Sequence, residues 1–116
     1  MDEFSWFVGL YEGEGCFDTQ VKKKIVNGKE YTFVNNRLTI KMTDEDTIAR
    51  AAKFLGVSYH VSDKKYTEQC GRKTIYRVCK SGGKTGQLID LVEKMYPHLC
   101  KRRQEQIDAK LSKYNE

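Results

Sequence analysis

Gly9 and Gly13 lie four residues apart in a segment whose apolar residues have helical spacing. The spacing i, i+3, i+4, i+7 predicts one apolar helix face, made of Phe4, Phe7, Val8 and Tyr11. Each glycine inside a helix costs roughly 1 kcal/mol relative to alanine, so two of them need a structural reason. Glycine lets another helix approach closely, and the sequence has no second glycine-paired helix. We therefore expect a second copy of the chain to supply the partner helix, in a two-fold dimer.

The remaining segments predict a repeated order of one helix and two strands. Asn27-Gly28 between two alternating segments is a strong hairpin signal. Thr43, with Asp46 three residues later, predicts a helix start with Thr43 as the cap. The expected elements are a helix over 4–13, strands over 16–25 and 30–42, a helix to Leu55, strands over 57–64 and 73–80, a glycine-rich loop over 80–86, and helices over 87–95 and 101–114. This order predicts an α+β fold with the plan αββαββα, in a single domain over residues 1–116.

Composition excludes several classes of protein. Of the 116 residues, 39% are hydrophobic, which is too many for a disordered tail. No apolar stretch approaches the ~20 residues of a membrane helix, so no membrane partner is expected. Asp2 and Glu3 stand where a signal peptide requires basic residues, so we expect an intracellular, non-secreted protein. The four cysteines are then expected to be free thiols, and the scattered Cys and His residues predict no zinc site.

Charge is concentrated in blocks. Residues 18–43 carry six Lys or Arg against two Asp or Glu, and residues 60–85 carry seven against two. The first fifteen residues, in contrast, contain four acidic residues and no base. Basic blocks of this kind favour a polyanionic partner, although a solvated basic surface would have the same charge.

Alternation in the first hairpin separates two faces, because successive strand side chains point to opposite sides. The face expected to pack on helices contains Phe17, Thr19, Val21, Ile25, Val34, Asn36, Leu38, Ile40 and Met42, interrupted by Lys23. The opposite face has residue types that pair with base edges and phosphates, namely Asp18, Gln20, Lys22, Lys24, Asn35, Arg37, Thr39 and Lys41. A two-stranded ribbon fits the major groove of DNA, so we predict DNA contacts for these residues and for Arg77 in the second strand pair.

Glu14 follows the glycine helix at its C-terminal end, where the helix macrodipole disfavours an anion. An acid in this position indicates a functional role or an external cation; the alternative is a solvated glutamate at a frayed helix end. In a dimer, two such carboxylates near the symmetry axis would repel each other unless a metal such as Mg²⁺ neutralised them. The sequence Gly-Lys-Thr at 83–85 does not predict a nucleotide cofactor, because a phosphate-binding loop needs glycine where Val78 stands.

Residues 7–17, FVGLYEGEGCF, resemble the LAGLIDADG motif with its usual continuation. Residues 38–48 and 54–57 also resemble the strand-to-helix passage of that family. The chain is thus similar to a single-motif LAGLIDADG homing endonuclease, whose four-stranded antiparallel sheet forms a DNA-binding saddle. The resemblance implies a homodimer paired at Gly9 and Gly13, with Glu14 binding the catalytic divalent metal, Mg²⁺ or Mn²⁺.

The resemblance also implies a basic residue near the start of the C-terminal helix that assists at the scissile phosphate. We assign this role first to Lys101, and Arg102 and Arg103 are the alternatives. Asp44 matches a position that is glutamine in some relatives near the active site; here we expect it to support a helix N-terminus. The implied reaction is metal-dependent cleavage of both strands of a long pseudo-palindromic DNA site, leaving 3′ overhangs.

Two other functions stay open at this point. One is a non-cleaving LAGLIDADG protein, either a DNA-binding regulator or an RNA splicing maturase. The other is an unrelated basic binding domain. The acid at position 14 favours a nuclease, because binding alone does not require a carboxylate facing phosphates. The resemblance is compatible with an intron-encoded reading frame, while the target sequence, the host gene and the choice among an intron, an intein and a free-standing context are left open.

Overall fold

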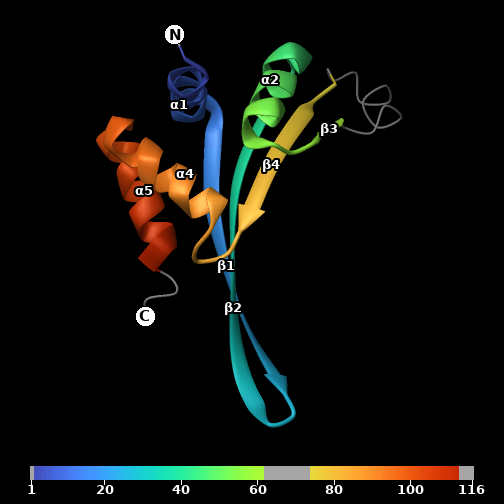
Figure 1. Cartoon of the computed structure of the whole chain (residues 1–116), viewed down its shortest axis with the longest axis vertical. Coiled ribbons are helices and arrows are strands. Elements are labelled where there is room, and N and C mark those ends of the chain that lie inside the picture. The colour runs from blue at the N-terminus through green and yellow to red at the C-terminus, as the bar shows by residue number, and fades with distance from the viewer. Residues whose placement is uncertain (1, 62–73, 113–116) are drawn as a thin grey trace. The chain divides into compact units, whose positions relative to one another are not determined.

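The computed structural model describes residues 2–61 and 74–112, and its elements follow the predicted order (Figure 1). The helices and strands are α1 (Glu3–Glu14), β1 (Gly15–Val26), β2 (Lys29–Met42), α2 (Glu45–Leu55), β3 (Tyr59–Val61), β4 (Tyr76–Gly82), α4 (Gln87–Met95), the 3₁₀ helix η1 (Tyr96–His98) and α5 (Lys101–Leu111). The fold is α+β with the plan αββαββα, as predicted. None of the described helices has the length and apolar character needed to cross a membrane.

Four strands form one antiparallel sheet in the order β1-β2-β4-β3. β3 and β4 are antiparallel, with His60 opposite Arg77. The chain divides into two compact units: the first contains Met1–Cys16 and Thr39–Lys80, and the second contains Phe17–Leu38 and Ser81–Glu116. The expectation of a single domain over residues 1–116 stays a prediction.

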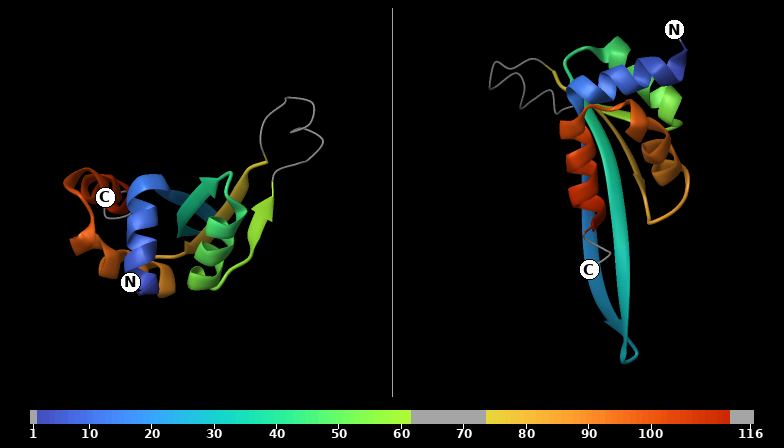
Figure 2. Two further views of the ribbon diagram at one scale, coloured as in Figure 1. Left: turned by 90° about the horizontal axis from the view of Figure 1, so that it is seen from above. Right: turned by 90° about the vertical axis from the view of Figure 1, so that its left-hand side faces the viewer.

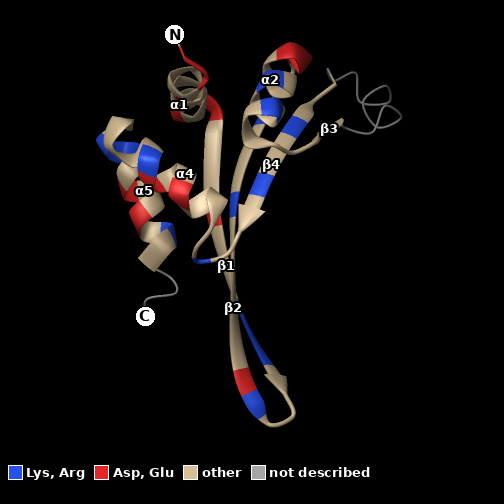
Figure 3. Ribbon diagram, viewed as in Figure 1, with Lys and Arg blue, Asp and Glu red and all other residues tan. Residues whose placement is uncertain are grey.

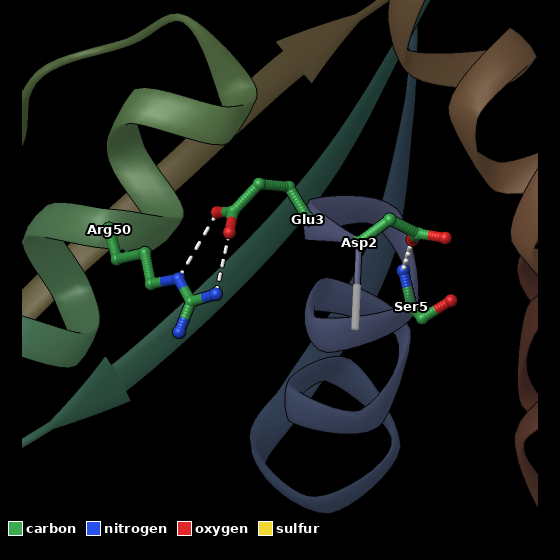
Figure 4. Close-up of polar contacts among 4 residues, drawn as sticks. All are labelled: Asp2, Glu3, Ser5 and Arg50. Carbon is green, nitrogen blue, oxygen red and sulfur yellow. Dashed lines mark hydrogen bonds and ion pairs between the residues drawn. The ribbon is translucent and has the colours of Figure 1, made fainter.

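In the first unit, α1 and α2 lie side by side (Figure 2). Phe7 stacks on Phe54 with ring centroids 4.7 Å apart. At the start of α1, Asp2 caps the helix by accepting a hydrogen bond from the Ser5 amide at 2.7 Å. Arg50 of α2 donates to both carboxylate oxygens of Glu3, as Figure 4 shows. Hydrogen bonding from Arg50 holds the pKa of the Glu3 carboxyl below its usual value.

The second unit combines the β1–β2 hairpin with α4, η1 and α5. A buried polar chain joins the hairpin to the segment after β4: Thr19 Oγ1 donates to Asn36 Oδ1 at 2.5 Å, and Asn36 Nδ2 donates to the Gly83 carbonyl at 2.9 Å. Tyr96 donates to Asp108 across η1 and α5 at 2.8 Å. Thr19 and Asn36, the buried polar side chains of the hairpin, are therefore both hydrogen-bonded, as burial of polar groups requires.

Three details differ from the sequence predictions. The cap of α2 is Asp44 instead of Thr43: its Oδ1 accepts from the Asp46 amide and its Oδ2 accepts from the Thr47 hydroxyl. The role expected for Asp44 at a helix N-terminus is confirmed. β4 continues to Gly82, so the first residues of the expected loop belong to a strand. Ile25 is 75% exposed, because the packing face of the hairpin ends before it.

Some predictions fall partly outside the described residues. The second strand pair was expected over 57–64 and 73–80; the described part of β3 covers only Tyr59–Val61, and residues 62–64 and 73 lie outside the described residues. Cys16 and Cys79 carry free thiols, as expected, whereas Cys70 lies outside the described residues.

Candidate nucleic-acid interface and metal-binding residue

Glu14 is the last residue of α1, and Gly15 begins β1 with no loop between them. The Gly15 amide donates to the Tyr11 carbonyl and closes the helix. A Cβ at position 15 would lie less than 3 Å from three atoms of the Tyr11 ring, so only glycine fits here without moving that ring. The Glu14 residue itself is exposed. The junction therefore presents a carboxylate at a position fixed by both the helix and the strand.

Gly9 and Gly13 are exposed on α1, while Phe7, Val8 and Tyr11 are buried. A Cβ at either glycine would meet nothing within 4 Å inside the chain. Packing within the chain therefore does not require glycine at these positions. A helix of another molecule that approaches closely would require glycine at these positions.

The outer face of the second unit is the hairpin face opposite the buried side chains Phe17, Thr19, Asn36 and Leu38. Alternation along β1 and β2 puts six predicted DNA contacts on it: Asp18, Gln20, Lys22, Lys24, Asn35 and Arg37. Gln20, Lys22, Lys24 and Asn35 are exposed. Figure 3 shows basic residues along this hairpin.

Asp18 lies between two cations within this unit. Its Oδ1 is 3.2 Å from the Lys110 ammonium, and its Oδ2 is 3.7 Å from the Arg37 guanidinium. All three side chains are between 37% and 40% exposed. The carboxylate therefore orients two positive side chains that remain accessible to a polyanion.

The outer face of the first unit contains the other three predicted contacts, Thr39, Lys41 and Arg77. Lys41 and Arg77 line an open depression of about 290 Å³ together with three residues not predicted from the sequence, His60, Val61 and Ile75. His60 is directly opposite Arg77 in the strand register, so its side chain shares that face. The depression offers two cations, an imidazole and aliphatic groups to a ligand.

Lys101, Arg102 and Arg103 form the first turn of α5, which contains no acidic residue. The macrodipole disfavours cations at a helix N-terminus, so the local structure does not explain this cluster. The Lys101 side chain is 89% exposed, and its ammonium is 4.0 Å from Glu105. Arg103 donates to Gln106 at 3.2 Å. Lys101 is thus more exposed than Arg103, and its surface ion pair with Glu105 is weak.

The sequence profile of the LAGLIDADG endonuclease family matches residues 7–111. The chain belongs to the LAGLIDADG endonuclease family. No curated protein sequence matches the chain.

Solved structures of homing endonucleases share the LAGLIDADG fold with this chain. I-CvuI, solved with the I-CreI target and magnesium and with the DNA not cleaved, is 22% identical with a TM-score of 0.61, covering 95% of this chain and 64% of that one. I-TnaI is 17% identical with a TM-score of 0.52, covering 90% and 65%. Archaeal intron-encoded I-Vdi141I, complexed with DNA, is 16% identical with a TM-score of 0.53, covering 90% and 62%. This chain thus spans 62–65% of the length of these three proteins.

The described residues of this LAGLIDADG chain contain few groups placed to hold a divalent metal. Among residues 2–61 and 74–112, no three His, Cys, Asp or Glu side chains cluster closely enough to hold an ion. Mg²⁺, however, is usually held by one or two carboxylates together with water and phosphate oxygens. One exposed Glu14 from each of two copies, completed by DNA, fits that preference. The chain alone offers no all-protein cage within its described part.

Sequence reasoning about this LAGLIDADG chain missed Tyr31 and Phe33 on the hairpin and His60, Val61 and Ile75 at the depression. Aromatic and aliphatic side chains are not among the charged and amide types that pair with phosphates and base edges, so residue type gives no signal for them. Counting the hairpin positions outward from Asn27-Gly28 would have put Tyr31 and Phe33 on the outer face. His60 required the β3–β4 register, which the sequence did not define.

Proposed function

We propose that the chain is a site-specific double-stranded DNA endonuclease that acts as a homodimer on a long pseudo-palindromic site. It hydrolyses one phosphodiester bond in each strand with a divalent metal, Mg²⁺ or Mn²⁺, and leaves 3′ overhangs. The observation that carries the proposal is the exposed carboxylate of Glu14 at the end of the glycine-bearing α1, within a chain of an endonuclease family.

Binding of the duplex is assigned to the outer faces. Lys22, Lys24 and Lys41 are exposed and bind phosphates or guanine edges, while Gln20 and Asn35 donate and accept hydrogen bonds at base edges. Arg37 and Lys110, each paired with Asp18 and partly exposed, add positive charge for the same polyanion. Thr39 and Arg77 extend these contacts in the first unit.

The chemistry is assigned to Glu14 and Lys101. Glu14 from each copy would hold the divalent ion, which supplies charge stabilisation for the attacking and leaving oxygens. The Lys101 ammonium stabilises the negative charge that develops on the scissile phosphate. Water attacks phosphorus in line and gives a proton to solvent, the bond to the 3′ oxygen breaks, and that oxygen takes a proton from solvent. Gly9 and Gly13 allow the two α1 helices to approach closely and bring both carboxylates to one duplex.

Cleavage separates this proposal from a non-cleaving binding protein. The purified chain is incubated with a randomised duplex library and Mg²⁺, and cut products are sequenced. We expect an enriched site with 3′ overhangs. Glu14→Gln should retain binding and lose about 10²–10³-fold or more in cleavage rate, whereas Glu93→Gln, an exposed control on α4, should cut normally. Equal cleavage by Glu14→Gln would refute the metal role, and binding with no cut product would favour a non-cleaving regulator.

The homodimer has its own test. Light scattering on the DNA complex should give two chains per duplex for the unmodified protein. Gly13→Leu should give one chain or no complex, because a leucine side chain would separate the two α1 helices. Glu93→Leu is the matched control at an exposed helical position. Two chains of Gly13→Leu on the duplex would exclude pairing through this helix face.

A further inference from the structure

The outer end of the β1–β2 hairpin, residues 22–33, is exposed at every position. It nevertheless contains two large aromatic side chains, Tyr31 at 45% and Phe33 at 54% exposure. The tip extends beyond the helices of its own unit (Figure 2), so burial does not explain them. An exposed aromatic pair that the fold does not use is available for a ligand.

The register of the hairpin determines which face these aromatics share. Asn27 and Gly28 form a two-residue turn with φ values of 53° and 80°. Counting outward from it puts Thr19 opposite Asn36 and Asp18 opposite Arg37, and the contacts of both pairs agree. The same count puts Phe33 opposite Lys22 and Tyr31 opposite Lys24. These four side chains therefore lie on the outer face, with the predicted DNA contacts.

Charge distinguishes the two faces of the tip. On the inner face, Lys23 is 3.8 Å from Glu30, so the basic charge is balanced by an acid. On the outer face, Lys22, Lys24 and Lys29 accompany the aromatics, and the tip has no acidic residue on that side. The outer face thus suits a polyanion that also offers an apolar contact.

Duplex DNA has one such apolar feature in the major groove, the C5-methyl group of thymine. A phenyl ring has no hydrogen-bonding group, so its favourable contact with a base edge is with this methyl. Tyr31 and Phe33 are two residues apart on one strand face, or about 7 Å. That separation corresponds to about two base-pair steps of 3.4 Å.

We propose that Phe33 and Tyr31 are specificity-determining residues that select thymine at two positions, about two base pairs apart, in each half-site. Lys22 and Lys24 bind the flanking phosphates. This inference rests on the proposed function, because it requires the outer face to contact duplex DNA. It adds the base preference, which neither the family nor the polar residues of the hairpin supply.

The experiment begins with selection of bound sequences from a randomised duplex library by the full chain, without divalent metal. Each thymine in the selected half-site is then replaced by deoxyuridine, which removes only the methyl group. We expect about a fourfold loss of affinity at two thymines, the effect of one buried methyl each. In Phe33→Ala one of these losses should disappear, and in Tyr31→Ala the other.

Two control variants test whether thymine selection belongs to Phe33 and Tyr31 alone. Ile25→Ala, on the inner face of the same tip and 75% exposed, should keep both deoxyuridine effects. Lys22→Ala should weaken all sequences about equally and reduce the salt dependence by about one released counterion. Circular dichroism should show each variant folded, since none of these side chains is buried.

The outcomes distinguish the two proposals. If the chain selects a duplex but deoxyuridine has no effect anywhere in the half-site, the thymine assignment is wrong and DNA binding stands. The same holds if Phe33→Ala selects the same bases as the unmodified chain. A chain that selects no duplex at all overturns both the proposed function and this inference.

Discussion

The two ends of the β1–β2 hairpin differ in how much of their sequence the core requires. Near the helices of the second unit, Phe17, Thr19, Asn36 and Leu38 are buried, and the residues between them are more accessible. Near the turn, from residue 22 to residue 33, both faces are exposed. Packing in the core therefore explains the alternation at the base, whereas packing does not explain the residue types at the tip. The lysines and aromatics at the tip are therefore not required by the core, whereas the buried residues at the base are.

Two phenylalanines give the largest expected contrast between base and tip. Phe17 is 5% exposed and Phe33 is 54% exposed. Phe17→Ala should lower the free energy of unfolding by about 3–5 kcal/mol, because it removes a buried ring and leaves a cavity. Phe33→Ala should change it by no more than about 0.5 kcal/mol. Urea denaturation of both variants measures the difference, and similar losses would show that the tip is packed in solution.

The buried polar chain at the base provides the next contrast. Thr19→Val leaves Asn36 Oδ1 without this donor and should cost about 1–3 kcal/mol of unfolding free energy. Thr32→Val, the same change at an exposed tip position, should be nearly neutral. Combining Thr19→Val with Asn36→Leu should cost less than the two single changes added together, because they share one hydrogen bond. Strict additivity would indicate that the bond contributes nothing.

Ion pairs should give the smallest contrast. Lys23 and Glu30 at the tip are 70% and 59% exposed, so Lys23→Ala should change the unfolding free energy by at most about 0.5 kcal/mol. Asp18 at the base contacts two cations, and Asp18→Asn should cost more, about 1 kcal/mol. The difference should shrink in about 1 M salt, where the screening length is ~3 Å. Thermal denaturation at low and high salt measures both losses. A larger loss for Lys23→Ala than for Asp18→Asn would contradict this expectation.

Local signals were sufficient to predict most of the fold. Asn27-Gly28 predicted the hairpin, the apolar spacing predicted the buried face of α1 with Phe7, Val8 and Tyr11, and Gly56 predicted the end of α2. The cap of α2 was misassigned because Thr43 and Asp44 are both good capping residues. The choice between them depends on backbone geometry, and Asp44 has the extended conformation of a cap.

The site was less predictable, for reasons that differ between residues. The position of Glu14 at a helix end followed from the sequence, because glycine and helical spacing define that end. The buried role of Asn36 depends on the Gly83 carbonyl, 47 positions away in the chain, which local patterns do not reveal. His60 became a member of the outer face only through pairing with β4. The roles of Lys101 and of the predicted DNA contacts remain predictions, and Lys22→Ala tests one of those contacts.

The absence of a linker between α1 and β1 restricts chain length as well as residue identity at that junction. Inserting one residue into α1 after Tyr11 would turn the Glu14 side chain by about 100° around the helix axis. It would also remove Gly15 from beneath the Tyr11 ring. Natural or engineered diversification of this segment is therefore expected to proceed by exchange of side chains, such as aspartate for glutamate, and to exclude insertions and deletions.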